Sequence, residues 1–432
     1  MKVCVLGLWH LGTVIAACLA SAGHQVIGLD FDAATVQRLQ AGQPPLYEPE
    51  LEELVRQGLA EGRLSFSMEI AESLSDSELI WVAYDTPVDE EDRADVDFVL
   101  KRVIQLFPYL SAGTLVLLSS QLPVGSTGRL EREYALMFPD RPVMFGYSPE
   151  NLRLGKAIRS FTRPDRFVVG VRNEADRKRL QELLQPFSAR IEWMSVESAE
   201  MTKHALNAYL ATSITFINEV ATLCEQVGAD AREVERGLKS DTRIGPRAYL
   251  MPGAAFAGGT LARDIQFLAQ IAAAHNQRPL LLSAVRASNE THKLWPRRRL
   301  RALLGDLKSK RVAILGLTYK PGTDTLRRSS SVELCEWLAQ QGAIVQTHDP
   351  AVKKLPEPLI QKFTLHPTPL AALAGTSVLV IATEWPEYRL LTPESILSVM
   401  RKPLVIDANG FLLTTLGCDQ RIQYAMVGKA QI

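Results

Sequence analysis

The chain has 432 residues, enough for about two to four domains. Its 48 Lys and Arg residues balance 48 Asp and Glu residues, so no net field favours nucleic acid or an anionic membrane. With 47% hydrophobic and 22% charged residues, its composition is that of a soluble globular protein. Its five cysteines show no metal or disulfide spacing, which predicts a reducing cytoplasm and no metal site.

The first segment, residues 2–22, is an apolar run that ends in small residues. A signal peptide or a short membrane span has a similar pattern. Gly7, His10 and Gly12 interrupt the run, and an alternating strand follows it, so we favour a folded segment.

The predicted elements at the start are a strand at Lys2–Gly7, a helix at Gly12–Ala22 and a strand at Gln25–Asp30. The turn keeps two glycines of a G-x-G-x-x-G pattern, Gly7 and Gly12, and places Trp9 where the middle glycine would stand. Such a turn puts a pyrophosphate at the helix N-terminus. Asp30 ends the second strand, where a carboxylate can accept a hydrogen bond from the 2′-OH of the adenosine ribose. This position of the acid favours NAD over NADP. A βαβ unit that binds no dinucleotide is the alternative.

Further strands are predicted at Leu79–Tyr84, Leu115–Ser120, Pro142–Tyr147 and Arg166–Val171. Strands that alternate with helices indicate a parallel sheet, with ligands at the carboxyl ends of the strands. The loops at residues 85–87, 121–126 and 148–150 follow three of these strands, so they are candidate ligand loops.

The middle of the chain begins with a long predicted helix, Glu197–Val227. Lys203 and Asn207 are four residues apart, so they share one helix face. They are either part of a solvated polar face or a cation and an amide aimed at a developing oxyanion. The Gly/Ala-rich stretch Pro252–Asp264 follows, with Asp264 expected at the start of a second long helix that runs to about residue 304.

A second α/β block has predicted strands at Arg311–Gly316, Ile344–His348, Ser377–Ala382 and Leu404–Asp407, and a helix at Ser331–Gln341. Lys320 and Arg327 follow its first strand and are either donors to a diphosphate or a basic surface pair. The predicted fold is therefore α/β, with two Rossmann-like doubly wound parallel-sheet domains at 1–195 and 305–432. A helical central domain at 196–304, carrying the loop 252–264, joins them.

These motifs resemble those of the UDP-glucose/GDP-mannose dehydrogenase family, in order and over nearly the whole chain. The stretch at 252–264 is similar to the family's F-G-G-S-C-x-P-K-D loop and matches it at Phe256, Gly258 and Asp264. Thr260 stands in the position of the family's catalytic cysteine. Further departures are Gln121, Leu154, Ala262 and Arg263, and the family's D-x-R-N motif reads Asp407-Ala408-Asn409 here, without its arginine.

The resemblance implies roles for particular residues. The implied catalytic residues are Lys203, Asn207, Asp264 and Glu150, with Thr260 in place of the nucleophile. The implied cofactor-binding residues are Gly7, Trp9, Gly12, Asp30, Thr86, Ser120 and Arg327. The implied substrate-binding residues are Glu150, Leu152, Arg153, Lys203, Arg243, Phe256, Gly258 and Lys320.

The function that the resemblance implies is NAD-dependent oxidation of a UDP-sugar by a cytoplasmic homodimer that serves polysaccharide biosynthesis. The family transfers two hydrides, and the second transfer uses a thiolate that adds to the aldehyde. Thr260 is a poor substitute because a hydroxyl is far less ionised, so we expect a two-electron oxidation or an impaired aldehyde-to-acid step. The alternatives are a catalytically silent NAD and nucleotide-sugar binding or regulatory protein and, more weakly, a reductase running in reverse.

Overall fold

The structure is a computed structural model that describes residues 1–89, 94–150, 152, 154–257, 259–327 and 329–430. Two of the predicted site residues, Arg153 and Gly258, lie outside the described residues. The chain divides into two compact units, Met1–Leu206 (unit 1) and Asn207–Ile432 (unit 2). The division falls inside the long helix α9 (Val196–Val227).

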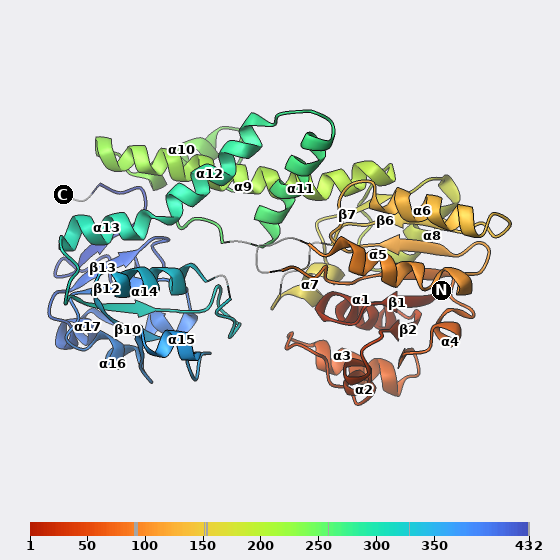
Figure 1. The fold of residues 1–432 in the computed structure, drawn as a ribbon, viewed down its shortest axis with the longest axis horizontal. Helices are drawn as coiled ribbons and strands as arrows, with labels where there is room; N and C mark the ends of the chain where they lie inside the picture. The colour runs from red at the N-terminus through yellow and green to blue at the C-terminus, as the bar shows by residue number, and fades with distance from the viewer. Residues whose placement is uncertain (90–93, 151, 153, 258, 328, 431–432) are drawn as a thin grey trace. The chain divides into compact units, whose positions relative to one another are not determined.

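Unit 1, which carries the N-terminus marked in Figure 1, is built on one sheet with the strand order β3-β2-β1-β4-β5-β6-β7-β8. The strands are β1 (Lys2–Leu6), β2 (Gln25–Leu29), β3 (Leu64–Ser67), β4 (Leu79–Val82), β5 (Leu115–Leu118), β6 (Met144–Tyr147), β7 (Phe167–Gly170) and β8 (Ile191–Met194). The helices are α1 (His10–Ser21), α2 (Ala33–Gln40), α3 (Leu51–Ala60), α4 (Ile70–Leu74), α5 (Val96–Ile104), η1 (Phe107–Tyr109), α6 (Ser126–Met137), α7 (Ala157–Thr162) and α8 (Glu174–Leu184). Residues 2–21 therefore form the predicted strand and helix of a folded unit.

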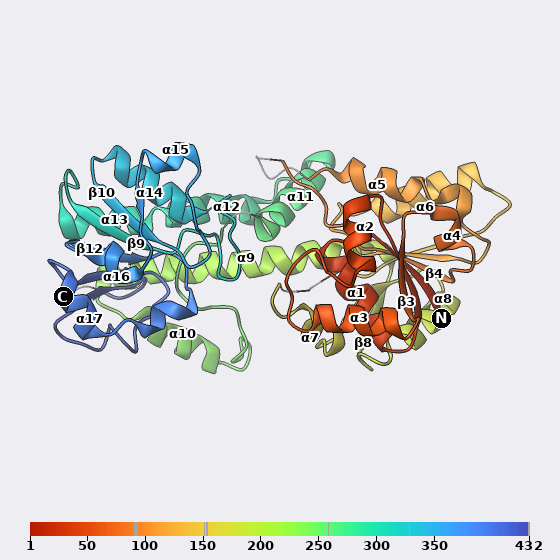
Figure 2. The same ribbon diagram turned by 90° about the horizontal axis from the view of Figure 1, so that it is seen from below.

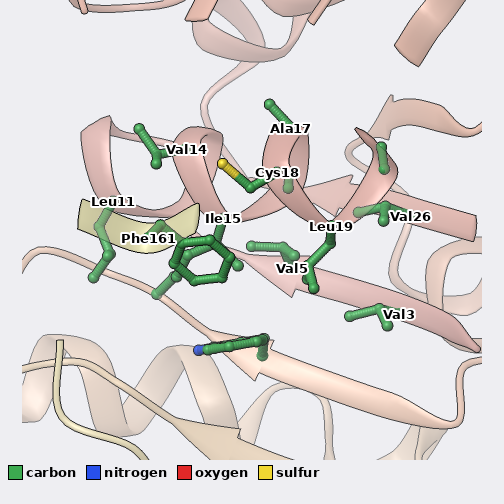
Figure 3. Packing of buried hydrophobic residues seen from close by; sticks show 14 of the residues in the cluster. Val3, Val5, Leu11, Val14, Ile15, Ala17, Cys18, Leu19, Val26 and Phe161 are labelled. Carbon is green, nitrogen blue, oxygen red and sulfur yellow. The ribbon is translucent and has the colours of Figure 1, made fainter. Parts of the chain in front are cut away.

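Helices cover both faces of this sheet, because successive side chains of a strand point to opposite sides. In β1, Val3 and Val5 belong to the buried cluster that includes α1, α3, α7 and α8. Their neighbours Cys4 and Leu6 belong to the cluster that includes α5 and α6. Figure 3 shows the first face, where Ile15 of α1 lies above β1. The doubly wound arrangement is confirmed.

One strand pair departs from the predicted parallel sheet. β6 and β7 pair antiparallel through Tyr147 and Gly170, and β7 then pairs parallel with β8. The described part of the connection between β6 and β7 consists of irregular segments and the six-residue helix α7, and the course of this connection sets the direction of pairing. The strand order reverses between β1 and β4, and such a switch point opens a ligand crevice beyond the carboxyl ends of the strands.

Unit 2 contains a second sheet with the strand order β11-β10-β9-β12-β13-β14, all in parallel pairs. The strands are β9 (Arg311–Leu315), β10 (Ile344–His348), β11 (Thr364–Leu365), β12 (Val378–Ile381), β13 (Leu404–Asp407) and β14 (Gln423–Ala425). The helices after α9 are α10 (Ala231–Ser240), α11 (Thr260–Ala274), α12 (Leu280–Lys293), α13 (Trp295–Leu304), α14 (Ser330–Gln340), α15 (Glu357–Ile360), α16 (Pro369–Leu373), η2 (Pro386–Leu390) and α17 (Pro393–Val399). Helices α14 and α16 lie on opposite sides of β9 (Figure 2).

The helical region before this sheet differs from the prediction in two ways. The single helix expected from 265 to about 304 is three helices, α11 to α13. Asn276, with a φ of 55°, and Pro279 interrupt it once, and Pro296 near the start of α13 marks the second break. Asp264 does not begin α11, because the helix starts four residues earlier, at Thr260. In the described ranges, no helix combines the length and apolar character needed to span a bilayer.

Candidate functional site

The turn between β1 and α1 has room only for glycine at its two ends. Gly7 has a φ of 91°, and its N–H donates to the Leu29 carbonyl at 2.9 Å. A Cβ atom at Gly12 would lie 1.7 Å from the Gly7 carbonyl oxygen. The backbone at the N-terminus of α1 therefore packs directly on the strand, as a pyrophosphate-binding turn requires. Trp9 precedes α1 with its side chain 47% exposed.

Asp30 follows β2 and lies beside this turn. One carboxylate oxygen accepts from the Leu8 N–H at 2.6 Å, and the other accepts from the Asp32 N–H at 3.1 Å. The side chain is half-buried, so the carboxylate keeps a solvent-facing part. A carboxylate has about four acceptor positions, which leaves capacity for ribose hydroxyls.

Two buried hydroxyls border the crevice at the carboxyl ends of β4 and β5. The hydroxyl groups of Tyr84 and Ser120 have no hydrogen-bond partner within the described residues. A Cβ atom at Gly7 would lie 2.8 Å from the Tyr84 ring, so the ring closes one side of the glycine turn. Thr86 is also buried, and its hydroxyl donates to the Gln121 carbonyl at 2.8 Å. The glycine turn, the open acid and the unpaired hydroxyls together fit a dinucleotide.

Glu150 lies on the loop after β6 and is linked to Lys203 of α9. The Lys203 ammonium donates to the Glu150 carbonyl oxygen, and the Glu150 carboxylate accepts from the Leu152 N–H. Burial raises the pKa of the Glu150 carboxyl, and the nearby Lys203 charge opposes that rise. The Glu150 carboxyl therefore exchanges its proton at a higher pH than an ordinary carboxyl does.

The N-terminal half of α9 is fixed by two buried side chains that flank Lys203. The Glu200 carboxylate accepts from the N–H groups of Gly125 at 2.5 Å and Thr127 at 2.9 Å, at the start of α6. The His204 ring lies 3.0 Å from the Leu122 carbonyl oxygen. These contacts hold the backbone of α9 against the loop after β5 and thereby fix the direction of Lys203.

Asn207 lies one helical turn after Lys203, and both side chains are only 7% exposed. The solvated polar face considered above is therefore wrong. The Asn207 amide donates to the Asp264 carboxylate, and Asp264 is fully buried in α11. Thr260, by contrast, is the exposed first residue of α11. Its hydroxyl lies at a helix N-terminus, where a thiol would be activated but an alcohol stays protonated.

The loop at 252–256 is held by four side chains that the sequence did not single out as site residues. Asn218 of α9 accepts from the Gly253 N–H at 3.0 Å, and His292 of α12 lies 2.8 Å from the Gly253 carbonyl oxygen. Asn289 of α12 bonds both the N–H and the carbonyl of Phe256, at 3.0 and 2.9 Å. Asn409 accepts from the Ala254 N–H at 2.6 Å.

A sequence signal existed for part of this clamp. Asn289 and His292 are three residues apart on one helix, so they face the same side. Polar side chains at that spacing on a packed helix indicate a buried hydrogen-bond network. Nothing local in the sequence indicates that the network holds this loop.

The remaining predicted residues lie in other parts of unit 2. Lys320 is half-buried, with its ammonium 5.4 Å from the Tyr319 ring centre, and Arg327 is exposed. Arg243 is also exposed and pairs with Asp241 at 2.7 Å. A cavity of about 300 Å³ opens at the carboxyl ends of β12 and β13, and it is bordered by Ala255, Lys293, Arg297, Ser330 and Ala408.

The chain matches three domains of the UDP-glucose/GDP-mannose dehydrogenase family: the NAD binding domain at residues 1–188, the central domain at 197–291 and the UDP binding domain at 313–414. The chain belongs to the UDP-glucose/GDP-mannose dehydrogenase family. It is accordingly an NAD-dependent oxidoreductase of the nucleotide-sugar dehydrogenase class.

Individual relatives of this family cover nearly the whole chain. The UDP-glucose 6-dehydrogenase of Pseudomonas aeruginosa is 35% identical over 99% of this chain and 98% of that protein. The Rhizobium meliloti UDP-glucose 6-dehydrogenase is 33% identical over 99% of this chain and 100% of that protein. A UDP-glucose dehydrogenase structure from Pyrobaculum islandicum has a TM-score of 0.84 at 32% identity, covering 94% of this chain and 93% of that chain.

Proposed function

We propose that this member of the UDP-glucose/GDP-mannose dehydrogenase family oxidises the sugar of a UDP-hexose, with UDP-glucose as the first candidate. We further propose that the alcohol-to-aldehyde step is faster than the aldehyde-to-acid step. The observation that carries it is the buried Asn207–Asp264 hydrogen bond one turn from Lys203, in a chain with Thr260 at the start of α11. The chain carries the side chains that we assign to the first step, and position 260 has a hydroxyl where the second step would use a thiol.

The first oxidation needs a proton acceptor for the hydroxyl and a stabiliser for the alkoxide that forms. Bound NAD would supply the hydride acceptor. The Asp264 carboxylate, oriented by Asn207, takes the hydroxyl proton through a water molecule. Lys203 and Asn207 then stabilise the developing negative charge as buried donors, where a charge-assisted hydrogen bond is stronger than in water.

The second oxidation requires a tetrahedral adduct of the aldehyde that carries a donatable hydride. Without a thiolate, that adduct is the hydrate, formed when water adds to the carbonyl. Glu150 is the base we assign to this addition, since burial places its pKa above the ordinary carboxyl range. Hydration makes the second step slow, so the aldehyde accumulates.

A cytoplasmic homodimer is part of the same proposal. On α9, Tyr209, Phe216 and Leu223 are each at least half exposed and recur every seven residues, which sets them on one stripe of the helix. An exposed apolar stripe of this kind supports packing against a second copy of the chain. Light scattering of wild type against Phe216→Glu tests it, and a monomeric wild type would contradict it.

The deciding experiment measures NADH formed per UDP-glucose consumed, with product mass, for wild type and Thr260→Cys. The proposal expects a ratio near one for wild type, with a trapped aldehyde or hydrate, and a rise toward two in the variant. A ratio near two with a uronic acid product from wild type would overturn the two-electron assignment. Binding of both NADH and UDP-glucose without turnover would indicate the silent binder or another sugar.

A further inference from the structure

A buried carboxylate outside the assigned site joins three separate segments of unit 1. Glu48 lies between α2 and α3, and its side chain is only 1% exposed. Its carboxylate accepts from the N–H groups of Gly155 and Ala157, both at 2.7 Å. One of its oxygens also lies 3.0 Å from the His10 ring nitrogen Nε2. A buried carboxylate with three partners is a rigid junction, because removing it leaves each partner unpaired.

The first of those segments is the dinucleotide turn. His10 is the first residue of α1, and its side chain is 14% exposed. It therefore lies at the helix N-terminus where the pyrophosphate is expected. A ligand that orders this turn also fixes the His10 ring and, through the ring, the Glu48 carboxylate.

The second segment carries Glu150. Gly155 and Ala157 close the loop that begins after β6, and Ala157 is the first residue of α7. A cavity of about 50 Å³ is bordered by Leu11 of α1 and by Glu150. The loop therefore packs beside α1 as well as being tied to it through Glu48.

We propose that Glu48 and His10 form a positioning pair that couples occupancy of the dinucleotide turn to the placement of the Glu150 loop. The role assigned to Glu150 rests on the proposed function, whereas the coupling itself does not. Neither residue touches the reacting atoms; the pair acts through the amides of Gly155 and Ala157. Cofactor binding then steadies Gly155 and Ala157 before the sugar binds.

The test measures amide hydrogen exchange in the segment 154–160 with and without NADH, which requires neither sugar nor turnover. In wild type, NADH is expected to slow exchange in this segment about tenfold, within the usual range of coupling between two sites. In Glu48→Gln and in His10→Ala the slowing is lost, while the Kd of NADH changes by less than about threefold.

Glu200→Gln is the matched control. Glu200 is also a buried carboxylate that accepts from two backbone N–H groups, but its hydrogen-bond partners among the described residues, Gly125 and Thr127, lie at the start of α6. It is expected to lower the melting temperature while keeping the NADH-dependent protection of 154–160. Equal loss of protection in Glu200→Gln, or full protection in Glu48→Gln, would overturn the coupling. Protection without any turnover of UDP-glucose would leave the coupling intact and refute the proposed substrate instead.

Discussion

The two α/β units repeat one local design and use it differently. In unit 1, Gly7 follows β1 with a φ of 91°, and in unit 2, Gly316 follows β9 with a φ of 92°. Each glycine N–H donates across to the neighbouring strand, to Leu29 at 2.9 Å and to His348 at 2.8 Å. An aspartate follows that neighbouring strand in both units.

The two aspartates differ in what occupies their oxygens. Asp30 accepts from two backbone N–H groups and remains half-buried. Asp349 is 4% exposed, and one of its oxygens accepts from the Leu317 and Thr318 N–H groups, the Thr318 hydroxyl and the Trp385 indole. Its other oxygen accepts from two further N–H groups. The same acid therefore keeps free acceptor capacity in one unit and is an internal brace in the other.

The length of the segment between the glycine and the next helix also differs between the two units. In unit 1 only residues 8 and 9 separate Gly7 from α1, so the helix N-terminus lies against the strand. In unit 2 residues 317–329 separate Gly316 from α14, and this longer loop carries Lys320 and Arg327. A short glycine turn leaves the backbone donors of a helix N-terminus open to an anion, whereas a long one has room for cationic side chains.

The largest effect is expected from Asp349→Ala, which removes the brace of unit 2. Several buried donors lose their acceptor, so the free energy of unfolding of this unit falls by about 4 kcal/mol. Urea unfolding followed by circular dichroism measures the loss. The Kd of NADH stays within about twofold, because unit 1 is unchanged. A loss below about 1 kcal/mol would show that water replaces the carboxylate and that the brace is not structural.

Asp30→Ala is expected to weaken NADH binding by unit 1 and to leave UDP binding unchanged. The Kd of NADH rises about 30-fold, since a charge-assisted hydrogen bond contributes roughly 2 kcal/mol, and the preference over NADPH weakens. The Kd of UDP is the internal control and is expected to stay constant. Titration calorimetry with each ligand separates the two. An unchanged NADH affinity would show that the free capacity of Asp30 is not used by the ribose.

Much of the fold can be predicted from the sequence because the signals that determine these strands and helices are local. Strand periodicity, the spacing of Gly7 and Gly12, and a terminal acid placed β1, α1 and β2 to within two residues at each end. The edge strands β3, β8, β11 and β14 were missed because each has only two to four residues, too few for a periodic pattern to stand out. The antiparallel pairing of β7 was also missed, because the direction of pairing depends on a connection of irregular loops and one short helix.

The candidate site was predictable where one helix carries it and not where distant segments meet. Helical spacing alone puts Lys203 and Asn207 on one face of a helix, and the resemblance to the family supplies their expected role. The Asn289 contact with Phe256 joins residues 33 apart, and the Glu48 contact with Ala157 joins residues 109 apart. No periodicity connects such pairs. Nor does the sequence distinguish the open Asp30 from the saturated Asp349, because their difference lies in partners that folding supplies.

Lys320→Ala tests the claim that unit 2 uses cations in place of the short turn. The Kd of UDP is expected to rise about fivefold, and more at low ionic strength, because a half-buried ammonium is partly screened. Arg243→Ala is the control: another unit 2 cation, exposed and already paired with Asp241. Equal losses in the two variants would mean that only bulk charge matters.

The smallest effect is expected from Trp385→Phe, which removes one donor to Asp349 and keeps the aromatic ring. The indole N–H lies 3.1 Å from the Asp349 oxygen, and the free energy of unfolding is expected to fall by about 1 kcal/mol. The remaining donors still saturate Asp349, so no new acceptor becomes available, and adenosine is not expected to bind unit 2. Nucleoside binding in this variant, measured by calorimetry, would instead show that a single indole separates a structural acid from a ligand-binding one.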